Sequence, residues 1–168
     1  MAIVKRSDLP KIRKRHKNQK IVYCDGTFDL THAGHVLHFE DCKKHGDILV
    51  VGTGTDKMIR RYKGPERPVL NERVRLKTID SFKPVDYCFL FHIPGNKNLL
   101  SGLSAHFKSL KPDIYAINKD AFDIPYRKKV AKKFGVRLVI MGRTCPPEFD
   151  AISTSKIIEK IEKLVKPK

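Results

Sequence analysis

Short, nearly continuous apolar runs recur along the chain and are separated by polar or amphipathic stretches. A run of this kind is typical of a strand whose two faces are both covered. Five runs fit: Ile21–Cys24, Ile48–Gly52, Tyr87–Phe91, Ile114–Ile117 and Leu138–Met141. Each predicts one strand.

The stretches between these runs have helical spacing. They predict helices at Gly34–Lys44, Thr55–Arg61, Asn71–Phe82, Asn98–Leu110, Ile124–Phe134 and from Thr154 onward. The third has Val74, Leu76, Ile79 and Phe82 as its apolar residues, and the last has a stripe of Ile157, Ile158, Ile161, Leu164 and Val165 behind the expected N-caps Ser153 and Thr154. Strands that alternate with helices pair in parallel. The pattern therefore predicts a single-domain α/β fold, an open parallel sheet of about five strands with helices on both faces.

The charge is strongly positive and partly local. The 168 residues include 35 Lys and Arg against 18 Asp and Glu, a formal net charge of +17. This balance favours anionic partners such as nucleic acid, an acidic membrane surface or phosphate-bearing small molecules. Residues 1–20 hold eight Lys or Arg and one acid, Asp8. We expect 1–20 to be a solvated, partly helical basic lead-in, with contact to a polyanion as the alternative, and 21–168 to be the domain.

Cysteine spacing and hydropathy indicate the compartment. Four cysteines, Cys24, Cys42, Cys88 and Cys145, are scattered without a C-x-x-C pair. This is typical of reduced thiols and not of a disulfide framework or a structural zinc site. No apolar run approaches the roughly 20 residues of a membrane span, and the first six residues lack the apolar stretch of a secretory signal. The sequence predicts a cytoplasmic protein with no membrane partner.

The candidate chemistry follows the first predicted strand. There the chain reads D-G-T-F-D-L-T-H-A-G-H over residues 25–35. His32 and His35 stand at the start of a predicted helix, where unpaired N–H groups and two imidazoles can hold phosphate oxygens. Gly26 permits a tight turn that brings backbone amides toward the same phosphates. A lone histidine is usually a cap or core residue, and we expect His38, His45, His92 and His106, which have no motif around them, to be surface or core residues.

Three motifs in this order resemble the cytidylyltransferase-like branch of the nucleotidyltransferase superfamily. G-T-F-D-L-x-H-x-G-H stands at 26–35, K-G and N-E-R stand at 63–64 and 71–73, and I-S-T-S stands at 152–155 downstream of Arg143-Thr144. The resemblance implies a Rossmann-like fold and an enzyme that transfers a nucleoside monophosphate from ATP or CTP to a phosphorylated small acceptor, releasing pyrophosphate. It also implies Mg²⁺ on the triphosphate, and relatives are often homodimers.

The resemblance implies roles for individual residues. His32, His35 and Lys63 are the implied catalytic residues, which hold the triphosphate and its developing charge. The implied nucleotide-binding residues are Gly26, Thr27, Phe28, Arg73, Asn118, Arg143, Ile152, Ser153, Thr154 and Ser155. Without the resemblance, the cations would be solvated charges and the serines a simple helix cap. Asp29 reads equally well as a turn former or a ligand, and no dedicated carboxylate cage for a metal is visible.

Two segments depart from the family pattern. Cys145–Ala151, which contains two prolines, makes the spacing between Arg143-Thr144 and Ile152 longer than is usual. We expect it to reshape or cover the nucleotide pocket, which bears on the role of Arg143. Asn118–Asp123 replaces the stretch that in relatives helps define the base site, so the choice between ATP and CTP stays open.

Two classes of phosphorylated acceptor are compatible with the sequence. K-G-P-x-R-P at 63–68 and the Ser7-Asp8-Leu9 lead-in resemble bacterial heptose 1-phosphate adenylyltransferases. Asp25-Gly26, I-S-T-S and D-I-P-Y at 123–126 resemble cytidylyltransferases for glycerol 3-phosphate, phosphocholine or phosphoethanolamine. We favour the sugar phosphate. A hypothesis of another class is a basic nucleic-acid-binding protein on the same fold, although no stacking motif or recognition helix is evident.

Overall fold

The computed structural model describes residues 2–93, 100–149 and 153–165. The strands are β1 (Ala2–Val4), β2 (Ile21–Gly26), β3 (Ile48–Gly54), β4 (Tyr87–Phe91), β5 (Ile114–Asn118) and β6 (Arg137–Met141). A 3₁₀ turn at Arg6–Asp8 precedes the helices α1 (Leu9–Arg15), α2 (Ala33–Lys43), α3 (Asp56–Lys63), α4 (Glu72–Asp80), α5 (Ser101–Leu110), α6 (Ile124–Phe134) and α7 (Thr154–Val165). The predicted start of the α5 helix at Asn98 lies outside the described residues.

The strands form one parallel sheet in the order β1-β4-β3-β2-β5-β6. From β2 the chain builds outward through β3 and β4 on one side, and then crosses to build β5 and β6 on the other. The order therefore reverses between β2 and β5, and the crevice at such a switch point is where open α/β sheets bind ligands. The predicted fold class is confirmed.

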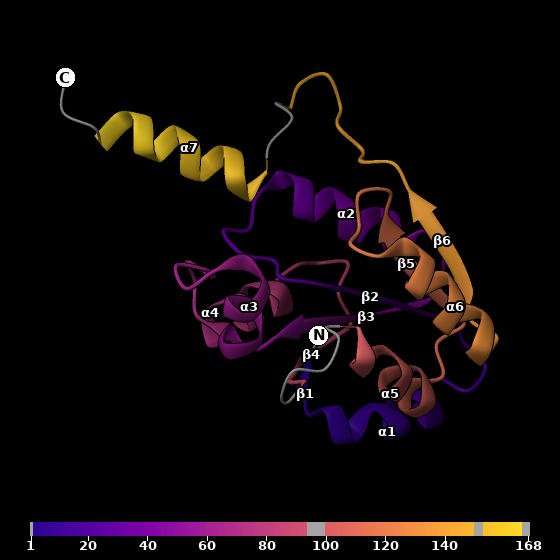
Figure 1. Ribbon diagram of the computed structural model, residues 1–168. Helices are drawn as coiled ribbons and strands as arrows, with labels where there is room; N and C mark the ends of the chain where they lie inside the picture. The colour runs from indigo at the N-terminus through magenta and orange to yellow at the C-terminus, as the bar shows by residue number, and fades with distance from the viewer. Residues whose placement is uncertain (1, 94–99, 150–152, 166–168) are drawn as a thin grey trace.

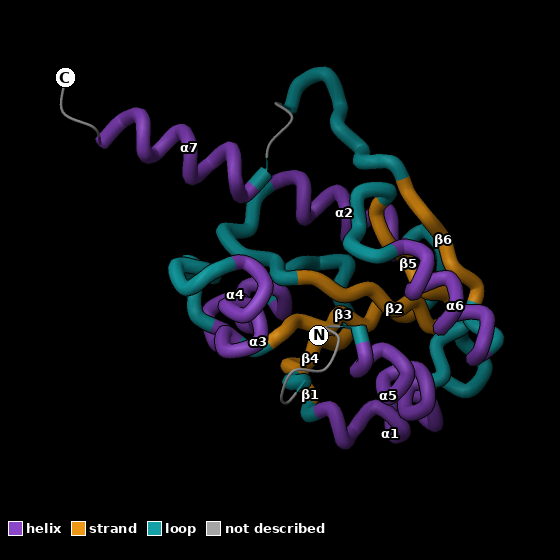
Figure 2. The backbone as a smooth tube through the Cα atoms, in the orientation of Figure 1, coloured by secondary structure: helices purple, strands orange, loops and turns teal. Residues whose placement is uncertain are grey.

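Helices cover both faces of the sheet (Figures 1 and 2). On one face α1, α5 and α6 pack on a core that includes Tyr23, Phe89 and Tyr115. On the other face α2 and α4 contribute Phe39 and Ile79 to a second core. Alternate residues of each strand serve the two cores, which is why the strands read as continuous apolar runs.

The basic N-terminal segment differs from the expected solvated lead-in. β1 pairs in parallel with β4 at the sheet edge, so the sheet has six strands where about five were predicted. Leu9 and Ile12 of α1 are buried in the core, with exposed fractions of 0% and 5%. Their spacing of three puts them on one helical face. Because lysines and arginines surround these two residues, the sequence shows no extended apolar pattern that would predict a buried helix here.

The first turn of helix α4 differs from the predicted apolar pattern, although Leu76 and Ile79 pack in the core as expected. Val74, which was expected to face the core, is 43% exposed, whereas Arg75 is completely buried. Arg75 shares a face with the buried Ile79, four residues later. A charged side chain thus occupies an inward position that the apolar pattern assigned to its neighbour.

Helix α7 projects from the body of the molecule (Figure 1). Ser153 caps it as predicted, because its Oγ accepts a hydrogen bond from the Lys156 amide at 3.3 Å. The predicted apolar stripe faces solvent in part, with Ile161, Leu164 and Val165 exposed by 50%, 76% and 74%. No helix in the described part of the chain is long and apolar enough to cross a membrane.

Candidate active site

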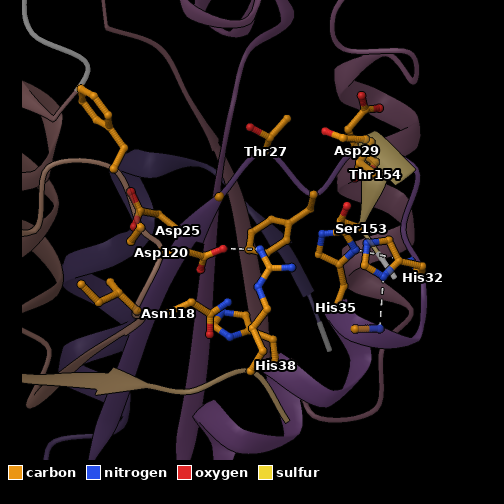
Figure 3. A pocket seen from close by; sticks show the side chains of 18 of the residues that line it. Asp25, Thr27, Asp29, His32, His35, His38, Asn118, Asp120, Ser153 and Thr154 are labelled. Atoms are coloured by element: carbon orange, nitrogen blue, oxygen red, sulfur yellow. Dashed lines mark hydrogen bonds and ion pairs between the residues drawn. The ribbon is translucent and has the colours of Figure 1, made fainter. Parts of the chain in front are cut away.

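A cavity of about 920 Å³ lies beyond the carboxyl ends of the central strands. Its walls come from the segment after β2, the first turns of α2, the end of α3, the segments after β5 and β6, and the start of α7. Figure 3 shows His32, His35 and Ser153 gathered on one side of it, with Asp25, Asn118 and Asp120 on the other. The histidine motif, Lys63 and the serines at the start of α7 therefore meet at the switch point of the sheet.

His32 and His35 form a pair at the N-terminus of α2. His32 is the N-cap, and its Nδ1 accepts a hydrogen bond from the Gly34 amide at 3.1 Å. The Nδ1 of His35 accepts from the His32 amide at 3.4 Å, and the two ring centroids are 4.1 Å apart. Because a backbone N–H can only donate, both neutral rings carry their proton on Nε2. Within the described part of the chain neither Nε2–H has a hydrogen-bond partner, so each can donate to an anionic ligand.

Both histidine rings are neutral near pH 7. Burial, followed by electrostatic repulsion from His32, His38, Arg143 and Lys63, lowers the pKa of His35 to about 3. Burial and then the charge of Arg143 also lower the pKa of His32. The pair thus offers hydrogen-bond donors in a cationic environment. Such an environment favours an anion that carries several charges.

The loop between β2 and α2 has a constrained backbone. A Cβ at Gly26 would lie only 2.8 Å from Cζ of the Phe28 ring, so the ring packs where only glycine leaves room. Phe28 and Leu30 adopt left-handed conformations, with φ of 50° and 45°. Non-glycine residues keep such conformations where the surroundings fix them, and these positions are frequent at binding sites.

Arg75 of α4 is the main support of this loop. Its guanidinium donates to the carbonyl oxygens of Thr27 and Gly54 at 2.7 Å each, to Thr53 Oγ1 at 2.7 Å and to Asp56 Oδ1 at 2.9 Å. Its Nε donates to the Leu70 carbonyl oxygen at 3.1 Å. The sequence instead singled out Arg73, which is exposed and does not line the cavity. The helical position of Arg75, four residues before Ile79, was the signal that could have found it.

Asp29 anchors the segment after α3. Its carboxylate is 1% exposed and accepts hydrogen bonds from Arg67 Nε at 3.0 Å and from the amides of Val69 and Leu70 at 2.9 Å each. Arg67 Nη2 completes an ion pair with it at 2.9 Å. Thr154 Oγ1 donates to the carbonyl oxygen of Asp29 at 2.7 Å. Of the two sequence readings, the structure shows a structural anchor that joins the loop, residues 67–70 and α7.

Lys63 and Arg143 bring positive charge to the cavity from two sides. Lys63 ends α3, and burial together with Arg67 lowers its pKa. Arg143 follows β6 and pairs with Asp120, and both side chains are about half exposed. An exposed pair of this kind contributes little stability. A phosphate group can therefore replace Asp120 as the partner of Arg143 at low cost.

The start of α7 closes the cavity near the histidines. Ser153, Thr154 and Ser155 all line it, as does Lys156. The inserted segment borders it too, since Cys145 and Phe149 are lining residues. The predicted contact of Ile152, and the end of the insertion at residues 150–151, lie outside the described residues.

The cavity has four aspartates in its described walls, and all have partners. Asp25 accepts from Tyr115 Oη at 2.7 Å and from Arg127 Nη1 at 3.0 Å. Asp29 holds Arg67, Asp120 holds Arg143, and Asp41 pairs with Lys44 and accepts from Thr144. These carboxylates are already paired with cationic side chains of the protein. This donor set fits a divalent ion that is held mainly by phosphate oxygens.

Asn118 and His38 line the cavity between β5 and α2. The Asn118 side chain hydrogen bonds to His38, and Cys42 Sγ lies 3.6 Å from His38 Nε2. The family resemblance implied the nucleotide-binding role of Asn118, whereas His38 was expected to be an ordinary surface or core residue. Other polar lining residues that the sequence did not single out include Asp25, Tyr62, Arg67 and Arg127. Arg127 had a local signal, since it belongs to the first turn of a helix that follows a strand end.

The chain is similar to known proteins over most of its length. Residues 23–160 match the sequence model of the family described as cytidylyltransferase-like. The chain is 34% identical over 156 residues to the bifunctional protein HldE of Helicobacter pylori strain P12, covering 92% of this chain and 30% of that protein. HldE of Campylobacter jejuni subsp. jejuni is 35% identical over 149 residues, covering 88% and 29%. The chain thus spans about 30% of the length of these relatives.

Solved structures share the fold. The lipopolysaccharide core biosynthesis protein of Thermoplasma volcanium has a TM-score of 0.64 and 28% sequence identity, covering 76% of this chain and 99% of that one. Pantoate-beta-alanine ligase of Francisella tularensis has a TM-score of 0.64 at 18% identity, covering 98% and 77%, and is similar in fold alone. The family match covers most of the chain, including both histidines, the α3 lysine and the start of α7. On this ground the chain belongs to the cytidylyltransferase-like family and is a nucleotidyltransferase.

Proposed function

We propose that this nucleotidyltransferase transfers AMP from ATP to the phosphate of a heptose 1-phosphate type of sugar phosphate. The observation that carries the reaction type is the neutral histidine pair, with each Nε2–H free to donate, at the helix N-terminus of a cationic cavity. The K-G-P-x-R-P stretch at 63–68 and the similarity to HldE proteins support the acceptor class.

In the proposed reaction, a phosphate oxygen of the acceptor attacks the α-phosphorus of ATP in line. The new P–O bond forms as the bond from the α-phosphorus to the bridging oxygen breaks, and the electron pair leaves with pyrophosphate. Negative charge grows on the bridging and non-bridging oxygens. His32 and His35 donate to these oxygens from Nε2, and the N-termini of α2 and α7 add unpaired amides.

We assign the cationic side chains around the cavity to the nucleotide or to the acceptor. Arg143, whose charge lowers the pKa of both histidines, and the start of α7 are assigned to the triphosphate. Lys63 ends the helix that leads into the segment held by Asp29, and is assigned to a phosphate of either substrate. Mg²⁺, which this family typically uses, enters as part of the nucleotide complex, because the cavity aspartates already hold protein cations.

A pyrophosphate-release assay tests the proposal and its main alternative. ATP and CTP are each tested with Mg²⁺ against heptose 1-phosphate, glycerol 3-phosphate, phosphocholine and phosphoethanolamine. The proposal expects turnover with ATP and heptose 1-phosphate. Turnover with CTP and one of the other three acceptors would keep the reaction type and replace the substrate assignment. Nucleotide binding without turnover on any pair would contradict the proposal as stated.

We also propose that the protein is cytoplasmic, and we predict that it forms a homodimer. All four cysteines are free thiols in the structure, which supports a reducing compartment such as the cytoplasm. The homodimer that the family resemblance implies is tested by sedimentation of the purified protein.

A further inference from the structure

A cluster of metal-ligating side chains lies behind the wall of the cavity. The Sγ atoms of Cys24 and Cys42 and a ring nitrogen of His38 all lie within 4.8 Å of one another. Both cysteines have exposed fractions of 0%. Cys24 comes from β2, whereas His38 and Cys42 come from consecutive turns of α2, at positions i and i+4 of one helix face. The cluster therefore joins the two elements whose junction carries the histidine pair.

The spacing of the ligand atoms fits a small thiophilic metal ion. With Zn–S of about 2.3 Å and Zn–N of about 2.1 Å, the sulfur and nitrogen of a tetrahedral zinc site are about 3.6 Å apart. Cys42 Sγ and His38 Nε2 are 3.6 Å apart in the structure. An ion at the centre of the three ligand atoms reaches all of them with small side-chain adjustments.

The surroundings suit a buried ion in charge as well as in distance. Two thiolates and a neutral imidazole balance the two positive charges of Zn²⁺, so the loaded site is neutral. A neutral cluster avoids the cost of an unpaired charge among the apolar side chains of this core, which include Phe28 and Phe39. His38 lines the cavity, which provides a path of entry for the ion. The Asn118 side chain orients the His38 ring from outside the cluster.

We propose that Cys24, His38 and Cys42 form a zinc-binding site that ties strand β2 to helix α2 beside the nucleotide cavity. The fourth position is open toward the cavity, where a water molecule can complete the tetrahedron. This ion is separate from the Mg²⁺ that accompanies the nucleotide, because its ligands are soft thiolates that Mg²⁺ does not favour. Sequence spacing gave no sign of it, since the two cysteines are 18 positions apart and on different elements.

Cobalt binding provides a direct test that needs no substrate. The full chain, reduced and freed of metal by a chelator, is titrated with Co²⁺ alone under anaerobic conditions. We expect one equivalent to give a thiolate-to-cobalt charge-transfer band with the visible bands of tetrahedral Co²⁺, and Zn²⁺ to abolish both. The charge-transfer band requires cysteine ligands, so Co²⁺ on His32 and His35 would not produce it.

Variants assign the site. We expect Cys42→Ser and His38→Asn to weaken Zn²⁺ binding, measured against a chromophoric chelator, by more than the about 10–100-fold that loss of an outer partner costs. Cys88→Ser is the matched control: Cys88 is also fully buried in this core, but its thiol points to the Leu76 carbonyl oxygen. It should bind like wild type. Circular dichroism checks the fold of each variant, and the half-buried His38 makes His38→Asn the variant that best preserves it.

Thermal unfolding gives a second readout. One equivalent of Zn²⁺ should raise the Tm of the wild type and of Cys88→Ser, because the ion binds the folded state. It should leave the Tm of His38→Asn unchanged. Absence of the charge-transfer band in the reduced wild type, or an equal band in folded His38→Asn and Cys42→Ser, would overturn the proposal. Neither result depends on nucleotidyl transfer.

Discussion

Arg75 Nη1 donates to the carbonyl oxygen of Thr27 at 2.7 Å, across 48 positions of sequence. Through this bond, helix α4 holds the loop that leads from β2 to the histidine pair. The same guanidinium also donates to the Leu70 and Gly54 carbonyl oxygens, to Thr53 Oγ1 and to Asp56 Oδ1. Arg75 does not itself line the cavity. It acts on the cavity wall through its hydrogen bonds to Thr27 and Gly54.

Replacement of this arginine should be costly. Arg75→Met leaves the Asp56 carboxylate and several carbonyl oxygens without their donor, and we expect the free energy of unfolding to fall by about 3–5 kcal/mol. Arg73→Met is the matched control on the same helix. Because Arg73 is exposed, its loss should change stability by no more than about 0.5 kcal/mol. Urea unfolding of the two variants measures both. Equal losses would contradict the supporting role of Arg75.

Much of the fold was predictable from local pattern. Strands β2, β3, β4 and β5 are buried over most of their length, so their apolar runs were continuous, whereas β6 at the sheet edge is exposed at Arg137 and Ile140. β1 was missed because it has three residues and gains its place only by pairing with β4, a contact between residues 85 positions apart. Arg75 was missed because its burial depends on acceptors from three other segments. Such a residue looks like surface until those segments are assembled.

The burial of His35 predicts a specific pH dependence. In the unfolded chain its ring takes up a proton below its ordinary pKa of 6.5, whereas the folded ring resists protonation until about pH 3. Stability must therefore fall as pH drops through this window, by about 1 kcal/mol from this ring between about pH 7.5 and 5.5. We expect His35→Asn to lose that part of the pH dependence. Urea unfolding of both proteins at the two pH values measures it, and identical slopes would contradict the assigned environment.

The candidate site was predictable where its chemistry lies in short motifs. The histidines, Lys63 and the serines at the start of α7 line one cavity, as the family resemblance implied. The partners that position them come from distant segments: Asp29 binds residues 67–70, and Arg127 of α6 reaches Asp25 at the end of β2. Contacts of this kind follow from the strand order, which a single sequence does not display.

The basic N-terminal segment should bind nucleic acid only without specificity. Its cations at positions 11, 14, 15, 17 and 20 are exposed around the buried Leu9 and Ile12. If about six phosphates are contacted, affinity for a random oligonucleotide should fall by about 10³-fold between about 50 and 200 mM salt. Fluorescence anisotropy across this range measures it. Tight binding that persists at the higher salt would favour the nucleic-acid-binding hypothesis.

The proposed catalysis depends above all on the histidine pair, His32 and His35. The decisive measurement is the turnover number of His35→Ala, taken from pyrophosphate release with the nucleotide and acceptor that the wild type uses. His45→Ala is the control, because His45 lies two residues beyond the end of α2 and does not line the cavity. We predict that His35→Ala, still folded by circular dichroism, loses at least about 10²–10³-fold in kcat, while His45→Ala keeps the wild-type value. Unchanged turnover in His35→Ala would contradict the account.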